Sequence, residues 1–164
     1  MTEKRMVWQR ADGTLAILIP APNGRREGES EEQWLTRITA RAMANDTGLA
    51  AAMRLPDTTS AELPTSWRFR NCWRADGDGR PAVEMALARA QRLEEIRAER
   101  DKRLAASDGP MARANETGTP PEIQALKQYR QALRDIPNQL TANNILEGLT
   151  TPEELEGFEP VWPE

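Results

Sequence analysis

The chain has 164 residues and a formal net charge of −4, from 22 Lys and Arg side chains against 26 Asp and Glu side chains. It contains no His and one Cys, which excludes His-dependent nucleophile pairs, thiolate metal clusters and internal disulfides. Only 38% of the residues are hydrophobic, and no apolar run approaches the roughly 18 residues of a membrane span. This composition favours a binding or assembly protein over an enzyme, and we expect no cofactor and no metal.

The first 84 residues predict a small α+β unit that begins with a β-hairpin. Apolar runs at residues 6–9 and 15–19 flank the Asp-Gly pair at residues 12–13. This dipeptide between two apolar runs is typical of a tight hairpin turn. Pro20 and Pro22 are expected to end the second strand, because proline donates no backbone hydrogen bond.

A helix and a second hairpin complete this predicted unit. The helix is expected to begin at Ser30, because Ser30 and Gln33 have the spacing of a capping box. A short, bent strand is expected over residues 67–74, followed by a tight turn at residues 76–79 and a return strand at residues 83–85. The core of the unit is expected to come from four tryptophans, which are Trp8, Trp34, Trp67 and Trp73.

Residues 85–137 predict an antiparallel helical hairpin. Its first helix is long and highly charged, and its second helix, residues 121–136, has Pro137 as its stop. Residues 107–121 are expected to break the helix, since they contain a Gly-Pro pair and a Pro-Pro pair. Apolar side chains at helical spacing form the predicted core of the hairpin, which consists of Leu93, Ile96, Leu104, Leu126, Tyr129 and Leu133.

The last predicted domain, residues 138–164, is an acidic tail with one short helix. Residues 147–164 contain six acidic side chains and no basic one, which leaves a net charge of +2 on the preceding residues. The Thr-Pro pair at residues 151–152 predicts the start of the helix, and an extended segment follows. Trp162 in this segment either docks on the body of the protein or anchors a partner.

The charged helix has two interpretations. Clustered arginines suit nucleic-acid binding, but residues 89–103 contain six basic and four acidic side chains in a chain of negative charge. A face directed to solvent or to a protein partner is therefore favoured.

The carboxylate pairs at 94–95 and 153–154 point apart on a helix and are not expected to catalyse a reaction. Residues 76–79 lack the further ligands of a calcium loop.

Four segments of the sequence together resemble a known family. They are residues 69–74 (FRNCWR), residues 96–105 (IRAERDKRLA), residues 129–137 (YRQALRDIP), and an ending with TPEEL at 151–155 and VWP at 161–163. In this order they resemble the C-terminal region of bacteriophage tail-fibre assembly chaperones and related tail accessory proteins. The resemblance extends over about residues 67–163.

The resemblance implies a non-catalytic protein that binds a tail-fibre or receptor-binding protein and assists its folding, trimerisation or attachment in the host cytoplasm during phage assembly. A structural subunit retained at the virion tail is the alternative, and self-association is left open. No membrane contact is expected, and a nucleic-acid-binding regulator is the least favoured class. The expected partner-binding residues lie on the arginine-rich face and in the C-terminal segment; they are Arg92, Arg97, Arg100, Arg103, Phe158, Val161 and Trp162.

Overall fold

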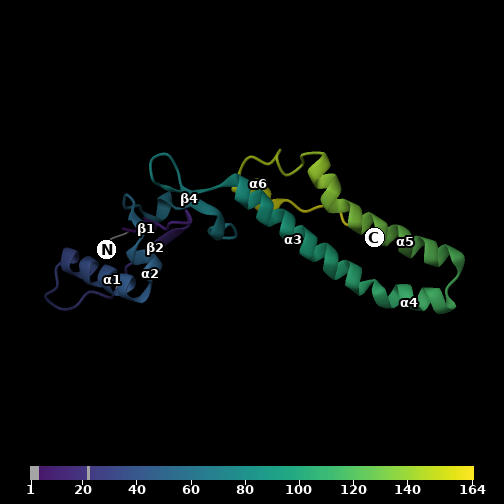
Figure 1. Ribbon diagram of the computed structural model, residues 1–164, viewed down its shortest axis with the longest axis horizontal. Coiled ribbons are helices and arrows are strands. Elements are labelled where there is room, and N and C mark those ends of the chain that lie inside the picture. The colour runs from purple at the N-terminus through teal and green to yellow at the C-terminus, as the bar shows by residue number, and fades with distance from the viewer. Residues whose placement is uncertain (1–3, 22) are drawn as a thin grey trace. The chain divides into compact units, whose positions relative to one another are not determined.

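The computed structural model describes residues 4–21 and 23–164, and it divides into two compact units, Met1–Glu84 and Met85–Glu164. Small antiparallel sheets lie in the first unit and long helices in the second, so the predicted α+β class is confirmed (Figure 1). The predicted role of Pro22 as a strand end lies outside the described residues. The two units are described separately below.

The centre of the first unit is a three-stranded antiparallel sheet. Strands β1 (Met6–Gln9) and β2 (Leu15–Leu18) form the predicted hairpin, and β3 (Met53–Arg54) pairs with the other side of β1, which gives the order β2-β1-β3. Gly13 has a φ of +81°, a conformation that favours glycine. The tight turn therefore depends on the Asp-Gly pair, as the sequence indicates.

One face of this sheet is covered by helix α1 (Glu31–Asn45), with the single turn α2 (Thr47–Ala50) following it. The capping box predicted at Ser30 is present, because its hydroxyl accepts from the Gln33 N–H and the Gln33 side chain accepts from the Ser30 N–H. Met6 and Trp8 point from β1 to this face and pack among the apolar side chains of both helices.

The opposite face of the sheet is covered by irregular chain and by the second hairpin, β4 (Trp73–Ala75) with β5 (Pro81–Val83). Two short 3-10 turns, η1 (Ser60–Glu62) and η2 (Arg70–Cys72), lie in this segment. The strand predicted over residues 67–74 was therefore too long, since only its last two residues are extended. Trp8, Trp34 and Trp73 are buried as predicted, whereas Trp67 is 58% exposed and lies against the Trp73 ring at 5.0 Å.

The second unit is helical, with α3 (Met85–Ala106), α4 (Asp108–Thr117), α5 (Pro120–Ala142) and α6 (Pro152–Gly157). Helices α3 and α5 run antiparallel side by side, and α4 connects them (Figure 1). Their shared core contains the buried residues Ile96, Leu133, Ile136 and Leu140. The short helix α6 packs on α3 through the fully buried Leu155.

Two helix boundaries differ from the sequence prediction. Residues 108–117 form α4 instead of a loop, because Pro110 stands in the first turn, where a backbone N–H has no helical partner to lose. Helix α5 continues five residues beyond Pro137 instead of stopping there. This continuation buries Leu140 against Ile96 and Leu133, and that burial outweighs the hydrogen bond that proline cannot donate.

Candidate functional site

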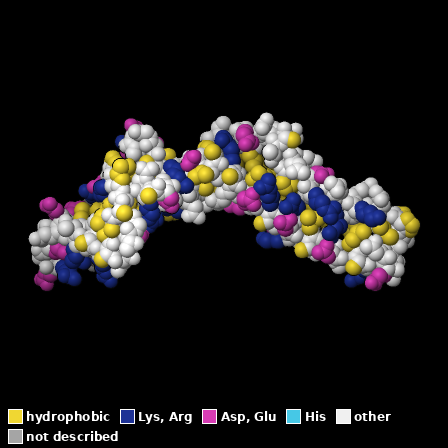
Figure 2. Space-filling model, viewed as in Figure 1, with side chains coloured by type: hydrophobic (Ala, Val, Ile, Leu, Met, Phe, Trp, Pro, Cys, Tyr) yellow, Lys and Arg dark blue, Asp and Glu magenta, His cyan; other side chains and the backbone are white. Residues whose placement is uncertain are grey.

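The candidate site is the C-terminal strap, which we define as residues 158–164, together with the helix side chains that hold it. The strap follows α6 without regular secondary structure. In Figure 2, basic, acidic and hydrophobic side chains are interspersed over the helices of this unit. The structure shows which of these charges hold the chain's own strap and which remain at the surface.

Arg92 is the main polar anchor of the strap. Its side chain is only 4% exposed, and it donates hydrogen bonds to the backbone carbonyl of Phe158 and, at 2.7 Å, to the carboxylate of Glu159. A third bond, of 3.2 Å, reaches Glu95 one turn along α3. A buried guanidinium is costly unless its charge and donors are matched. Arg92 therefore requires the strap in this position.

Aromatic contacts hold the strap farther along. The guanidinium of Arg103 lies 4.5 Å from the centre of the Trp162 ring, a cation–π contact, and it pairs with Glu99 at 3.1 Å. Phe158 and Trp162 pack against the core shared by α3 and α5. Of the two roles that the sequence leaves open for Trp162, the structure shows docking on the body of the protein.

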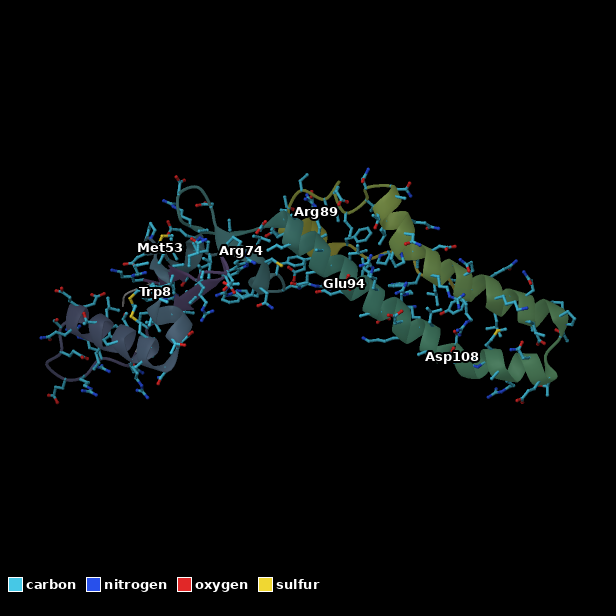
Figure 3. The ribbon with its side chains drawn as sticks, in the orientation of Figure 1. Trp8, Met53, Arg74, Arg89, Glu94 and Asp108 are labelled. Carbon is cyan, nitrogen blue, oxygen red and sulfur yellow. The ribbon has the colours of Figure 1, made fainter. Side chains whose placement is uncertain are left out.

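Arg89 holds the segment between α5 and α6. Its Nε donates to the carbonyl of Leu146 at 3.0 Å, and Nη2 donates to the carbonyl of Leu149 at 2.8 Å. Figure 3 labels Arg89 near the start of α3. The role of Arg89 was not predicted from the sequence, because its partners are backbone carbonyls far along the chain. Its position three residues before Arg92, on the same face of the helix, was the available signal.

Arg130 has a similar role where α3 meets α4. It donates to the carbonyl of Leu104 at 3.1 Å, to the hydroxyl of Ser107, and to the carboxylate of Asp108 at 2.7 Å. Asp108, labelled in Figure 3, stands at the start of α4. The carbonyls of the last turn of a helix have no intrahelical donor. Arg130 thus fixes the turn that returns the chain toward α5.

The predicted hairpin core is distributed over two places. Ile96 and Leu133 are buried between α3 and α5, and Leu104 and Tyr129 pack beside them. Leu93 is half-buried on α3. Leu126 lines a different feature, a groove of about 470 Å³ between α4 and α5, whose other lining residues include Pro110, Ala114, Gly118 and Ala125.

The predicted partner-binding residues lie in two environments. Four of them are engaged in the contacts between the strap and the helices that are described above: Arg92, Arg103, Phe158 and Trp162. Arg100 pairs with Asp101 at 2.8 Å, and Arg97 pairs with Glu94, with the Arg97 side chain 42% exposed. Val161 is 93% exposed. Val161 and Arg97 are consequently the members of this set most open to another molecule.

The described residues offer little for other kinds of site. Within residues 4–21 and 23–164, no group of three or more Cys, Asp or Glu side chains is placed to hold a metal ion. In the same residues, no helix has the length and hydropathy needed to cross a membrane. The structure of the second unit instead defines a strap seated on a pair of helices.

Residues 93–164 match the family model described as phage tail assembly chaperone protein. The match contains most of α3, the helices α4 to α6 and the strap, so the C-terminal region is similar to this family, as the sequence resemblance predicts. Residues 67–92, which the resemblance also included, lie outside the match. No curated protein and no solved structure matches the chain significantly.

The family match indicates a phage tail assembly chaperone, which is a non-catalytic role and implies interaction with phage tail proteins. The matched residues include Arg103, Arg130 and the whole strap. Arg92, the buried anchor, stands one residue before the match begins.

Proposed function

We propose that this protein is an assembly chaperone for a tail-fibre or receptor-binding protein, and that it acts in the host cytoplasm while the phage particle is built. It would bind the client and assist its folding, trimerisation or attachment to the tail, without catalysing a reaction. The observation that carries the proposal is the family match over residues 93–164, which coincides with the helices and the strap.

The proposed client-binding surface is the outer side of the strap. Along this segment, Pro160 is buried and Trp162 is docked, while Val161 between them is 93% exposed. A large apolar side chain exposed on an ordered segment is suited to binding, because little further conformational entropy is lost when the partner arrives. Glu159, which is on the strap and has a side chain 69% exposed, would form part of the polar rim around this contact.

Co-expression with the cognate fibre protein tests this surface. Val161→Asp places a charge where the proposed contact is apolar, and we expect the fraction of soluble, trimeric fibre to fall. Ala112→Asp is the matched control, since Ala112 is exposed on α4, away from the strap. If fibre solubility and co-purification are the same for Val161→Asp, Ala112→Asp and the unchanged chain, the strap is not the client-binding surface.

Deletion of residues 157–164 is a less specific test, because it also removes Phe158 and Trp162 from the core of the unit. Its far-ultraviolet circular dichroism should be compared with that of the full chain before any loss of fibre solubility is assigned to client binding. The point variant keeps these core contacts and is therefore the primary test.

The alternative, a structural subunit retained at the tail tip or on the fibre, would use the same surface. Mass spectrometry of purified particles separates the two functions. A released chaperone predicts no stoichiometric peptides in the virion, and their presence would favour the subunit.

A nucleic-acid-binding regulator is less favoured, since its candidate arginines all pair with carboxylates of this chain; these are Arg92, Arg97, Arg100 and Arg103. A mobility-shift assay at low salt tests it.

A further inference from the structure

The outer edge of strand β2 has backbone groups available for another strand. In the hairpin, the N–H of Arg10 donates to the carbonyl of Thr14 at 2.9 Å. Hydrogen-bonded and non-hydrogen-bonded pairs alternate along an antiparallel ladder. The N–H and C=O groups of Leu15 and Ile17 therefore point away from β1. The bond of 3.0 Å from Arg70 to the Leu15 carbonyl agrees with this direction.

Nothing in the described part of the chain continues the sheet beyond this edge. The order β2-β1-β3 places β2 at the end, and the N–H groups of Leu15 and Ile17 and the carbonyl of Ile17 have no backbone partner there. Natural edge strands are usually blocked by charges, prolines or bulges. Residues 15–18, with the sequence LAIL, contain none of these.

A hollow of about 360 Å³ runs along this edge, and its lining residues indicate which side chains a bound peptide would contact. All four residues of β2 line the hollow, together with Arg10, Asp46 and Arg70. Arg10 is paired with Asp46. A peptide laid along β2 would therefore meet apolar side chains over most of its length and a guanidinium at one end.

Arg70 carries a charge that no acidic side chain of the described residues pairs with. Its Nη2 donates to the Leu15 carbonyl, and its guanidinium lies 4.6 Å from the centre of the Trp73 ring. Burial, and secondarily the nearby charge of Arg10, lowers the pKa of Arg70. A guanidinium has five donors in a planar fork, so several remain for a carboxylate.

We propose that the edge of β2 binds an extended segment of a partner protein as a fourth strand, and that an Asp or Glu side chain of this segment pairs with Arg70. The added strand would exchange hydrogen bonds with the backbone of Ile17 and Leu15. The Leu15 carbonyl has two lone pairs, so it can accept from the added strand while it keeps its bond to Arg70. Main-chain pairing supplies affinity and the acidic position supplies selectivity.

This interaction surface goes beyond the proposed chaperone function, because residues 15–18 and Arg70 lie outside the family match. It does not depend on whether the strap binds a fibre. The test uses the full chain and defined peptides, so its failure leaves the co-expression result unaffected.

The probe is an eight-residue peptide of alternating valine and glutamate, acetylated and amidated, and labelled with a fluorophore that has no carboxyl group, so that the glutamate side chains are its only carboxylates. Its counterpart has lysine in place of glutamate. Fluorescence anisotropy with the full-length protein should show saturable binding of the glutamate peptide and at least about tenfold weaker binding of the lysine peptide, the ratio expected for loss of one charge-assisted pair. Equal affinities, or no binding of either peptide, would overturn the proposal.

Two variants locate the binding. Ile17→Pro removes an outward N–H that the hairpin does not use, and proline is tolerated at such edge positions; it should abolish binding. Arg70→Met should weaken glutamate-peptide binding about tenfold, and Arg41→Met on the exposed face of α1 should leave it unchanged. Near-ultraviolet circular dichroism of the tryptophans checks that each variant folds.

Self-pairing of two chains through the same edge gives a different result. In that case sedimentation would show a dimer that Ile17→Pro dissociates, and the glutamate peptide would not bind to the full chain. That outcome would contradict a partner segment as the occupant. Independently, unchanged affinity of a folded Arg70→Met variant for the glutamate peptide would contradict the proposed pairing of Arg70 with an acidic side chain of the bound segment.

Discussion

Arginine side chains connect distant parts of this protein by donating to backbone carbonyls. Arg89 binds the segment after α5, Arg92 binds the strap, and Arg130 binds the end of α3. A guanidinium suits this role because it offers several donors with fixed geometry while its stem packs against apolar neighbours. A composition rich in arginine can therefore stabilise a unit that has few large apolar residues.

Loss of the Arg92 side chain tests the importance of these connections. In Arg92→Ala, the Phe158 carbonyl and Glu159 lose their donor, and the packing of the arginine stem is lost as well. We expect the free energy of unfolding of the helical unit to fall by about 2 kcal/mol, as measured by urea denaturation followed by circular dichroism. Arg134→Ala on the exposed side of α5 is the control and should change it by less than about 0.5 kcal/mol.

The contacts of individual side chains were the part of the site that the sequence predicted least completely. The sequence identified Arg92, Arg103 and Trp162, but assigned the arginines to a partner-facing surface. Whether a charged side chain on a helix faces solvent or the chain's own tail depends on contacts between residues about 60 positions apart. Local spacing places Arg89 on the same helix face as Arg92 but does not specify its partners, so the sequence did not predict that Arg89 binds the segment after α5.

At the scale of elements, the boundaries set by local chemistry were predicted best. The hairpin turn at Gly13 and the capping box at Ser30 depend on a few adjacent residues, and both are present. The helix predicted to stop at Pro137 continues instead, because its next turn gains tertiary contacts. Sequence patterns therefore located the elements, while packing decided where one of them ended.

The continuation of α5 through Pro137 leads to a prediction for a stabilising variant. Pro137→Ala restores an N–H that can donate to the carbonyl of Leu133, at the cost of some buried ring surface. Inside a helix, alanine is favoured over proline by about 3 kcal/mol. This gain exceeds the about 1.6 kcal/mol that is lost when about two methylene groups of the proline ring are no longer buried. We expect a net gain of about 1 kcal/mol in the free energy of unfolding.

Thermal and urea unfolding of Pro137→Ala measure this gain. Pro121→Ala is the matched control, because Pro121 stands in the first turn of α5, where a new N–H finds no helical acceptor. The control should change stability little. A destabilised Pro137→Ala variant would mean that the buried ring contributes more than the restored hydrogen bond.

At the scale of the whole molecule, charge is divided unequally between the two units. Residues 1–84 contain 12 basic and 12 acidic side chains, so the entire net charge of −4 belongs to residues 85–164. The sequence prediction of an acidic end described part of this division. The neutral first unit contains the open edge of β2, and low net charge favours association of proteins through such edges.

Each unit contains its own buried cluster, and we therefore expect each to fold when expressed alone. A fragment of residues 85–164 should have the helical circular dichroism expected for α3 to α6 and should unfold cooperatively, because Ile96, Leu133 and the strap are all retained. A cut after residue 106 is the control. This cut places α3 and α5 on different fragments and separates Arg92 from its partners Phe158 and Glu159. Neither fragment should therefore contain a cooperatively folded helical unit. If the 85–164 fragment is unfolded on its own, the helices depend on the first unit for stability, and the two units form one cooperative domain.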